Sequence, residues 1–172
     1  GIVEVFPLSV RQTASVDLPG ESLGKGTFSA DGQGVLLAQS TGKVSVWNLA
    51  LRSNYSLGDH GAAVSSANFS LDGKFAVTTG GREARIWEAD RRRLVANLPH
   101  QSGVIYAAFS PDSRRVATTS YDGAVRLWKL SEGSLQLKVD HPVNGVHGVA
   151  FSPTAELFAT AGADGHIRLW DF

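Results

Sequence analysis

Short runs of alternating hydrophobic and polar residues fill the chain, and turn-forming residues end each run. In the segment 103–139, the runs GVIYAAF, RVATTS, AVRLW and LQLKV are rich in the β-branched and aromatic residues that favour strands. The sequences SPDSR and YDG lie between them and supply residues that tight turns need. No long segment has the 3.6-residue apolar spacing of an amphipathic helix. The pattern predicts an all-β protein of short antiparallel strands.

The same four-strand pattern recurs along the chain with a period of about 41 residues. A tryptophan ends the third strand of each unit, a Phe-Ser pair ends the first strand, and a histidine precedes that strand in the later units. The tryptophans are Trp47, Trp87, Trp128 and Trp170, the phenylalanines are Phe28, Phe69, Phe109 and Phe151, and the histidines are His60, His100 and His141. A four-stranded unit of this size cannot bury both faces alone, whereas units packed radially can. The repeat therefore predicts a β-propeller of four-stranded antiparallel blades.

At these positions the chain resembles the WD-repeat propeller family, and the resemblance covers essentially its whole length. In that family a histidine, a Ser or Thr on the second strand, an Asp in the next tight turn and the tryptophan form a buried hydrogen-bond chain, so each Asp is expected to bind its own histidine. The matching sets are His100, Thr118, Asp122 and Trp128 in the third repeat, His141, Thr160, Asp164 and Trp170 in the fourth, and His60, Thr78 and Trp87, without the Asp, in the second. The first repeat keeps only Trp47 of this set. The sequences of the turns are similar to those of bacterial members of the family.

The repeat also predicts where blades begin and end. GIVEVF at the start of the chain aligns with GAVRLW, so Phe6 occupies the place of a tryptophan in a preceding blade. We expect one propeller segment with a partial blade at 1–18, blades at 19–57, 58–98 and 99–139, and a partial blade at 140–172. Rings of this family mostly hold seven or eight blades. The resemblance therefore implies further blades, either from the same parent chain or from a second copy of this chain.

Composition narrows the possible functions. The chain has 16 basic and 16 acidic residues, which argues against broad nucleic-acid binding, and the run Arg91–Arg93 is typical of a solvated loop. The absence of cysteine excludes disulfides, thiolate metal sites and thiol nucleophiles. No apolar run approaches the roughly 20 residues of a membrane helix. We therefore expect neither nucleic acid nor a membrane as a partner.

The polar residues do not suggest catalysis. The repeated histidines occupy equivalent places on successive blades and cannot converge on one metal ion, and Asp122 and Asp164 belong to separate turns. Arg85, Arg126 and Arg168, two places before a tryptophan, are expected to cover blade edges with their aliphatic stems. The sequence thus predicts no enzyme, no metal and no cofactor. The alternative is a propeller enzyme or ligand-binding domain whose central-channel site is completed by further blades.

The resemblance implies a non-catalytic interaction platform, as the regulatory or sensor propeller of a larger cytoplasmic protein with a protein or peptide partner. Members of the family often make contacts through three places in each repeat: the residue just before the inner strand, the second residue of that strand, and the residue before the turn Asp. The matching residues here are Ser65, Ile105, His147, Tyr121 and Arg82. Tyr121 is the best single candidate, because aromatic residues dominate binding hot spots.

Overall fold

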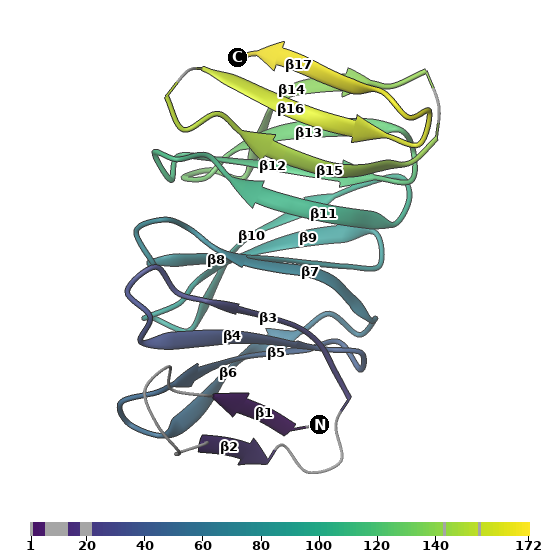
Figure 1. Cartoon of the computed structure of the whole chain (residues 1–172). Helices are drawn as coiled ribbons and strands as arrows, with labels where there is room; N and C mark the ends of the chain where they lie inside the picture. Colours follow the sequence, from purple (N-terminus) through teal and green to yellow (C-terminus); the bar gives the residue numbers. More distant parts are fainter. Residues whose placement is uncertain (1, 6–13, 18–21, 143, 155) are drawn as a thin grey trace.

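The computed structural model describes residues 2–5, 14–17, 22–142, 144–154 and 156–172. Its elements are all strands, and the described residues contain no helix, so the predicted all-β class is confirmed. Five antiparallel sheets follow one another along the chain and stack face to face, from the N-terminal hairpin to the C-terminal sheet (Figure 1).

Three of these sheets have four strands and are complete blades. Blade 1 contains β3 (Leu23–Phe28), β4 (Gly34–Gln39), β5 (Lys43–Asn48) and β6 (Ser53–Asp59). Blade 2 contains β7 (Val64–Phe69), β8 (Phe75–Gly80), β9 (Glu83–Glu88) and β10 (Arg93–Pro99). Blade 3 contains β11 (Val104–Phe109), β12 (Arg115–Ser120), β13 (Ala124–Lys129) and β14 (Ser134–Asp140). These are the strands that the sequence pattern predicts, to within about one residue in the third repeat.

The remaining two sheets lie at the ends of the stack. The end sheet has three strands, β15 (Val146–Phe151), β16 (Leu157–Gly162) and β17 (Ile167–Asp171). The N-terminal hairpin pairs β1 (Ile2–Val5) with β2 (Ala14–Asp17). Three complete blades with a partial sheet at each end agree with the predicted partial propeller. Phe6, the expected counterpart of the tryptophans, lies outside the described residues.

A side-chain hydrogen bond closes the turn after each inner strand, which explains why Phe-Ser recurs there. In blade 3, the Ser110 hydroxyl donates to Asp112 and accepts from the backbone N–H of Arg115, while Asp112 accepts from the N–H of Arg114. Ser29 with Asp31 and Ser70 with Asp72 repeat this arrangement. The turn therefore holds the first two strands of every blade in register.

The hydrophobic core lies between successive sheets rather than inside any one of them. Between blades 2 and 3, Val77 and Ile86 on one side meet Val104, Val116 and Trp128 on the other. Equivalent residues fill the spaces between blades 1 and 2 and between blade 3 and the end sheet. Each blade therefore depends on its neighbours for burial, as a repeat architecture requires.

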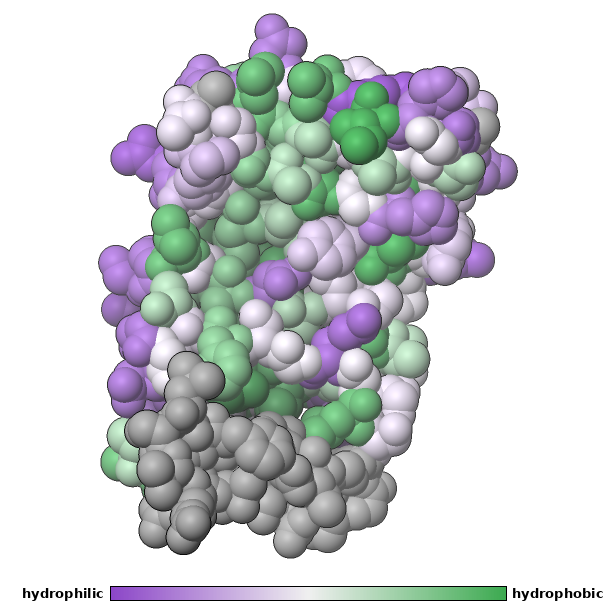
Figure 2. All heavy atoms as spheres, viewed as in Figure 1, coloured by the Kyte–Doolittle hydropathy of each residue, from purple (hydrophilic) through white to green (hydrophobic). Residues whose placement is uncertain are grey.

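The outer face of the end sheet lacks such a neighbour in this chain. Ile167 and Leu169 are 75% and 70% exposed, whereas Val125 and Leu127, at the same places in blade 3, are 1% and 3% exposed beneath the end sheet. Hydrophobic residues also form a band down the face that carries the inner strands β3, β7, β11 and β15 (Figure 2). The end sheet therefore exposes the kind of apolar face that is buried between the complete blades.

Candidate functional site

The turns between second and third strands and the loops that lead into the inner strands meet at one edge of the stack, which we call the first rim. It comprises residues 40–42, 60–63, 81–82, 100–103, 121–123, 141–142, 144–145 and 163–166. Backbone hydrogen bonds tie its parts together, within a blade from Tyr121 N–H to Gly103 O and between blades from Val104 N–H to Gly81 O, each 2.9 Å. The first rim is therefore a connected surface that spans neighbouring blades.

Every inner strand carries a β-bulge at its second residue. The pairing register shifts between Leu23 and Lys25 in β3, and at the corresponding places in the next three inner strands. The residues left unpaired by these bulges are Gly24, Ser65, Ile105 and His147. A bulge redirects a side chain away from the ladder, and such sites are often functional. Three of the predicted contact residues are thus bulge residues, which the sequence pattern did not reveal.

The predicted contact residues differ in how freely they face solvent. Tyr121 is 58% exposed, and its ring edge lies close to Gly103 on the same rim. Arg82 and His147 are also exposed, while Ile105 is half-buried. Large side chains of mixed character therefore stand on the first rim beside a rigid backbone.

Ser65 is also exposed, and in addition its hydroxyl is engaged within the fold. Its Oγ donates to the carbonyl oxygen of Val104 in the next blade and lies 2.7 Å from Thr79 Oγ1. In blade 3 the bulge residue is Ile105, which cannot make these bonds, and Thr119 Oγ1 is left buried without a hydrogen-bond partner among the described residues. Ser65 therefore links blades 2 and 3 through its hydroxyl.

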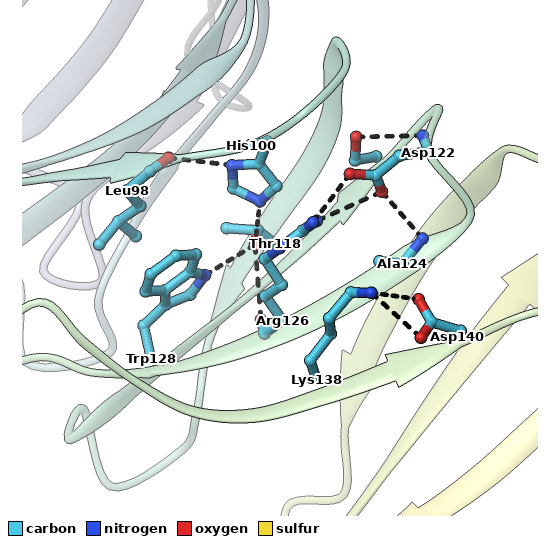
Figure 3. A network of polar contacts seen from close by, with 10 residues as sticks. Leu98, His100, Thr118, Asp122, Ala124, Arg126, Trp128, Lys138 and Asp140 are labelled. Atoms are coloured by element: carbon cyan, nitrogen blue, oxygen red, sulfur yellow. Dashed lines mark hydrogen bonds and ion pairs between the residues drawn. The ribbon is translucent and has the colours of Figure 1, made fainter.

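Below the first rim, the third repeat contains a buried chain of hydrogen bonds (Figure 3). Trp128 Nε1 donates to Thr118 Oγ1 at 2.8 Å, and His100 Nε2 lies 2.7 Å from the same oxygen. His100 Nδ1 faces the carbonyl oxygen of Leu98 at 2.9 Å, so Nδ1 carries the proton and Nε2 accepts from Thr118. These hydrogen bonds join the loop before β11 to the second strand, β12, and the third strand, β13.

The aspartate of this set does not bind the histidine, which corrects the expectation from the family resemblance. Both oxygens of Asp122 accept from Arg126, at 3.2 and 2.8 Å, and no hydrogen bond between Asp122 and His100 occurs among the described residues (Figure 3). Arg126 is buried, and a buried guanidinium needs a counter-charge more than a neutral imidazole does. The arginine therefore does not merely cover a blade edge: its charged head binds the turn carboxylate.

In the end sheet the arginine bridges the two groups. Arg168 donates to both oxygens of Asp164 and also approaches His141 Nδ1 at 3.2 Å. Because a guanidinium only donates, Nδ1 of His141 is unprotonated, and its Nε2–H donates to Thr160 Oγ1 at 2.9 Å. Trp170 donates to the same oxygen at 2.8 Å. The two histidines thus adopt opposite tautomers for the same structural purpose.

Blade 2 replaces the missing aspartate with a glutamate. His60 and Trp87 both bond to Thr78 Oγ1, at 2.7 Å each. The turn is one residue shorter, and Arg85 pairs with Glu83 instead. Nδ1 of His60 has no hydrogen-bond partner within the described part of the chain.

The histidines of these sets are held neutral. Burial, and after it the nearby Arg126, lower the pKa of His100 to about 4. Burial and Arg85 likewise lower the pKa of His60 to about 4, and burial and Arg168 lower that of His141. For Asp122, burial opposes ionisation, but the hydrogen bonds from Arg126 and Ala124 outweigh it and lower the pKa. At neutral pH these groups are fixed structural partners.

Within the described residues, no group of three or more His, Asp or Glu side chains is placed to hold a metal ion. In the same part of the chain there is no helix long and apolar enough to cross a membrane.

Comparison with known proteins adds the following findings. The model of the family described as WD domain, G-beta repeat matches residues 51–88, 92–129 and 133–171. Similar proteins include the Periodic tryptophan protein 2 homolog of Schizosaccharomyces pombe, 33% identical over 86 residues that make up 49% of this chain and 10% of that protein. The Ribosome biogenesis protein YTM1 of Podospora anserina is 27% identical over 121 residues, 62% of this chain and 25% of that protein.

The solved structure of U3-55K resembles the fold with a TM-score of 0.78 and 22% identity, covering 89% of this chain and 50% of that one. At this level of identity the likeness concerns the fold alone. The chain spans a quarter or less of the length of the two relatives above.

Proposed function

The chain belongs to the WD-repeat family, and from this premise we propose that it is part of a non-catalytic interaction platform whose first rim binds a protein or peptide. The observation that carries the proposal is the set of unpaired bulge residues beside the exposed Tyr121 on that rim. Ile105, His147, Arg82 and Tyr121 offer apolar, aromatic and charged contacts, the residue types that hot spots prefer.

Rigidity of the rim supports this function. The buried sets under the rim and the backbone bonds across it fix the turns before any partner arrives. A preorganised surface binds better, because less conformational entropy is lost on association. The same buried sets argue against catalysis, since their histidines are neutral, enclosed and used for structure.

The relatives support an intracellular role of this kind. One is named for ribosome biogenesis, a process that takes place inside the cell, and we propose a cytoplasmic location as the regulatory or sensor part of a larger protein. We further propose the segment boundaries 1–18, 19–57, 58–98, 99–139 and 140–172, with further blades from the parent chain or a second copy as partners.

An enzyme or a ligand-binding channel is the second candidate class. Besides Tyr106 on β11, the titratable side chains on the described inner strands are Lys25 on β3 and His147 on β15, and blades 2 and 3 lie between those two strands. A channel site would therefore require acids or histidines from other blades. Activity that survives substitution of the first rim would favour this class.

The test is a binding measurement on the intact protein. We expect Tyr121→Ala combined with Ile105→Ala to weaken binding of a partner recovered by crosslinking by about 2 kcal/mol or more, with little change in melting temperature. Leu71→Ala is the matched control, because Leu71 is an equally exposed apolar residue on the opposite edge of the stack. Equal losses for the two variants, or none for the first, would show that the first rim is not the binding surface.

A further inference from the structure

A groove opens between blades 2 and 3 at the edge opposite the first rim. Its volume is about 470 Å³. Phe75, Val95 and Leu130 form its apolar floor. The charged residues of its lining are Arg93, Arg114, Lys129 and one carboxylate, Glu88. Both blades are complete within the described residues, so the groove does not depend on any further blade. Its size falls within the range of sites that hold small ligands or a few side chains.

The corresponding space between blades 1 and 2 is filled, which shows that the groove is not a general property of the repeat. There Tyr55 occupies the position that Val95 has in blade 2. Each of them follows by three residues an arginine with a positive φ, Arg52 before Tyr55 and Arg92 before Val95. The guanidinium of Arg92 lies 4.4 Å from the centre of the Tyr55 ring and covers it. The space that remains is about 110 Å³.

Two substitutions in the repeat therefore open the groove between blades 2 and 3. Val95 lacks the ring of Tyr55, and Gly133, five residues after Trp128, stands where Arg92 stands five residues after Trp87. A side-chain carbon added to Gly133 would meet Ala96 on the outer strand of blade 2, so this turn does face the groove's outer strand. The groove thus lacks counterparts of both Tyr55 and Arg92, the two side chains that fill the space between blades 1 and 2.

The charged groups around the groove do not balance. Arg91 and Arg93 share one carboxylate, Glu88, at 3.3 and 2.7 Å, and Lys129 pairs with Glu132. Arg114 is exposed, and its charge acts on the nearby Asp112, with which it forms no close ion pair among the described residues. Of the residues that line the groove, three are cations, Arg93, Arg114 and Lys129, and one is a carboxylate, Glu88. The basic run 91–93 is divided between this groove and the Tyr55 contact. An anionic ligand would complement the positive charge around the groove.

We propose that the groove binds a short acidic peptide segment of a partner protein. An aliphatic side chain of that segment packs on Phe75, Val95 and Leu130, and flanking carboxylates bind Arg93, Arg114 and Lys129. A peptide fits this combination because it supplies alternating apolar and acidic groups within a few residues. This second surface lies apart from the first rim and acts independently of it.

Fluorescence anisotropy with the intact protein and a defined probe tests the proposal. The probe is a labelled, acetylated pentapeptide with one leucine between two pairs of glutamates. We expect Val95→Tyr to weaken its binding about tenfold, since the ring fills the groove as Tyr55 does between blades 1 and 2. Arg114→Glu should weaken it about fivefold or more. Val95→Ile and Tyr121→Ala should change it less than about twofold, because the first leaves the groove open and the second alters the other edge.

Two altered probes separate groove binding from simple attraction between opposite charges. Replacing the leucine by alanine, or all glutamates by glutamine, should each weaken binding about fivefold or more. Equal affinity for the leucine and alanine peptides would overturn the proposal in favour of a general anion surface, which oligonucleotides would then also occupy. No binding of the leucine peptide, or binding that Val95→Tyr leaves intact in a protein with an unchanged melting temperature, would overturn it as well.

Discussion

At the scale of single residues, an arginine lies two places before three of the four tryptophans, and it determines which hydrogen bonds the buried sets form. It sits four residues after the turn aspartate in blade 3 and in the end sheet, and it takes both carboxylate oxygens. The histidine then finds other partners, a backbone carbonyl in one case and the arginine itself in the other. The polar set therefore tolerates opposite histidine tautomers while it preserves the bonds to Thr and Trp.

This wiring predicts that Asp122→Ala is strongly destabilising. The change leaves Arg126 buried without its counter-charge, and breaking a buried pair in this way costs about 3 kcal/mol or more. Asp112→Ala removes an exposed ion pair with Arg115 and the turn bonds from Ser110 and Arg114, and it should cost less, about 1 kcal/mol. Urea unfolding of the intact protein measures both. Restored stability in the double variant Asp122→Ala with Arg126→Leu would support the pairing, whereas equal midpoints for Asp122→Ala and Asp112→Ala would contradict it.

The neutral histidines predict a loss of stability in mild acid. The pKa of His100 is about 4 in the folded protein and about 6.5 in an unfolded chain, so between these values the unfolded state binds more protons. Stability contributed by neutral His100 is therefore complete above about pH 6.5 and falls, by about 3 kcal/mol in all, as the pH decreases to about 4. His60 acts in the same direction. The free energy of unfolding of His100→Gln should depend less steeply on pH in this window, and an unchanged slope would refute the assignment.

At the scale of strands and turns, the sequence predicted the repeat well and the local pairing less well. The spacing of Trp, Phe-Ser and His located the strands, because these residues fill equivalent places between blades. The bulges were not predicted, since Gly24, Ser65, Ile105 and His147 share no property that a pattern could detect. The Asp–Arg pairs escaped prediction for a different reason. The repeated arginine was visible in the sequence, but its partner depends on which group the fold buries beside it.

The bulge in β11 predicts that binding and stability can be separated at one residue. Ile105→Ser places a hydroxyl where blade 2 has that of Ser65, next to Thr119 Oγ1, which lacks a hydrogen-bond partner among the described residues. We expect this variant to be more stable than Ile105→Ala by about 1 kcal/mol, the typical value of a hydrogen bond to a buried group. Both variants should lose partner binding equally. Thermal unfolding and a binding titration compare them, and a serine variant no more stable than the alanine variant would count against the proposed link.

At the scale of the whole molecule, the stack repeats one kind of interface. Aliphatic residues of the second and third strands of each blade receive the inner strand and the tryptophan of the next. The end sheet presents the same aliphatic surface, with small residues of β16 beside Ile167 and Leu169. An apolar face of this kind is unusual on an isolated domain. Its resemblance to the covered faces is the reason to propose a further blade, from the parent chain or a second copy, as its occupant.

Aspartate substitutions on the outer face of the end sheet test whether another blade covers that face. If another blade covers it in the intact protein, Ile167→Asp with Leu169→Asp buries two unpaired carboxylates, and stability should fall by several kcal/mol or folding should fail. If the face is exposed, the same change is a surface substitution with an effect within about 0.5 kcal/mol. Leu135→Asp is the control, because Leu135 is an exposed apolar residue on the outer strand of blade 3. Light scattering then identifies the source of the blade: a dimer that the charged variant splits into monomers indicates a second copy, whereas a monomer of unchanged mass indicates the parent chain.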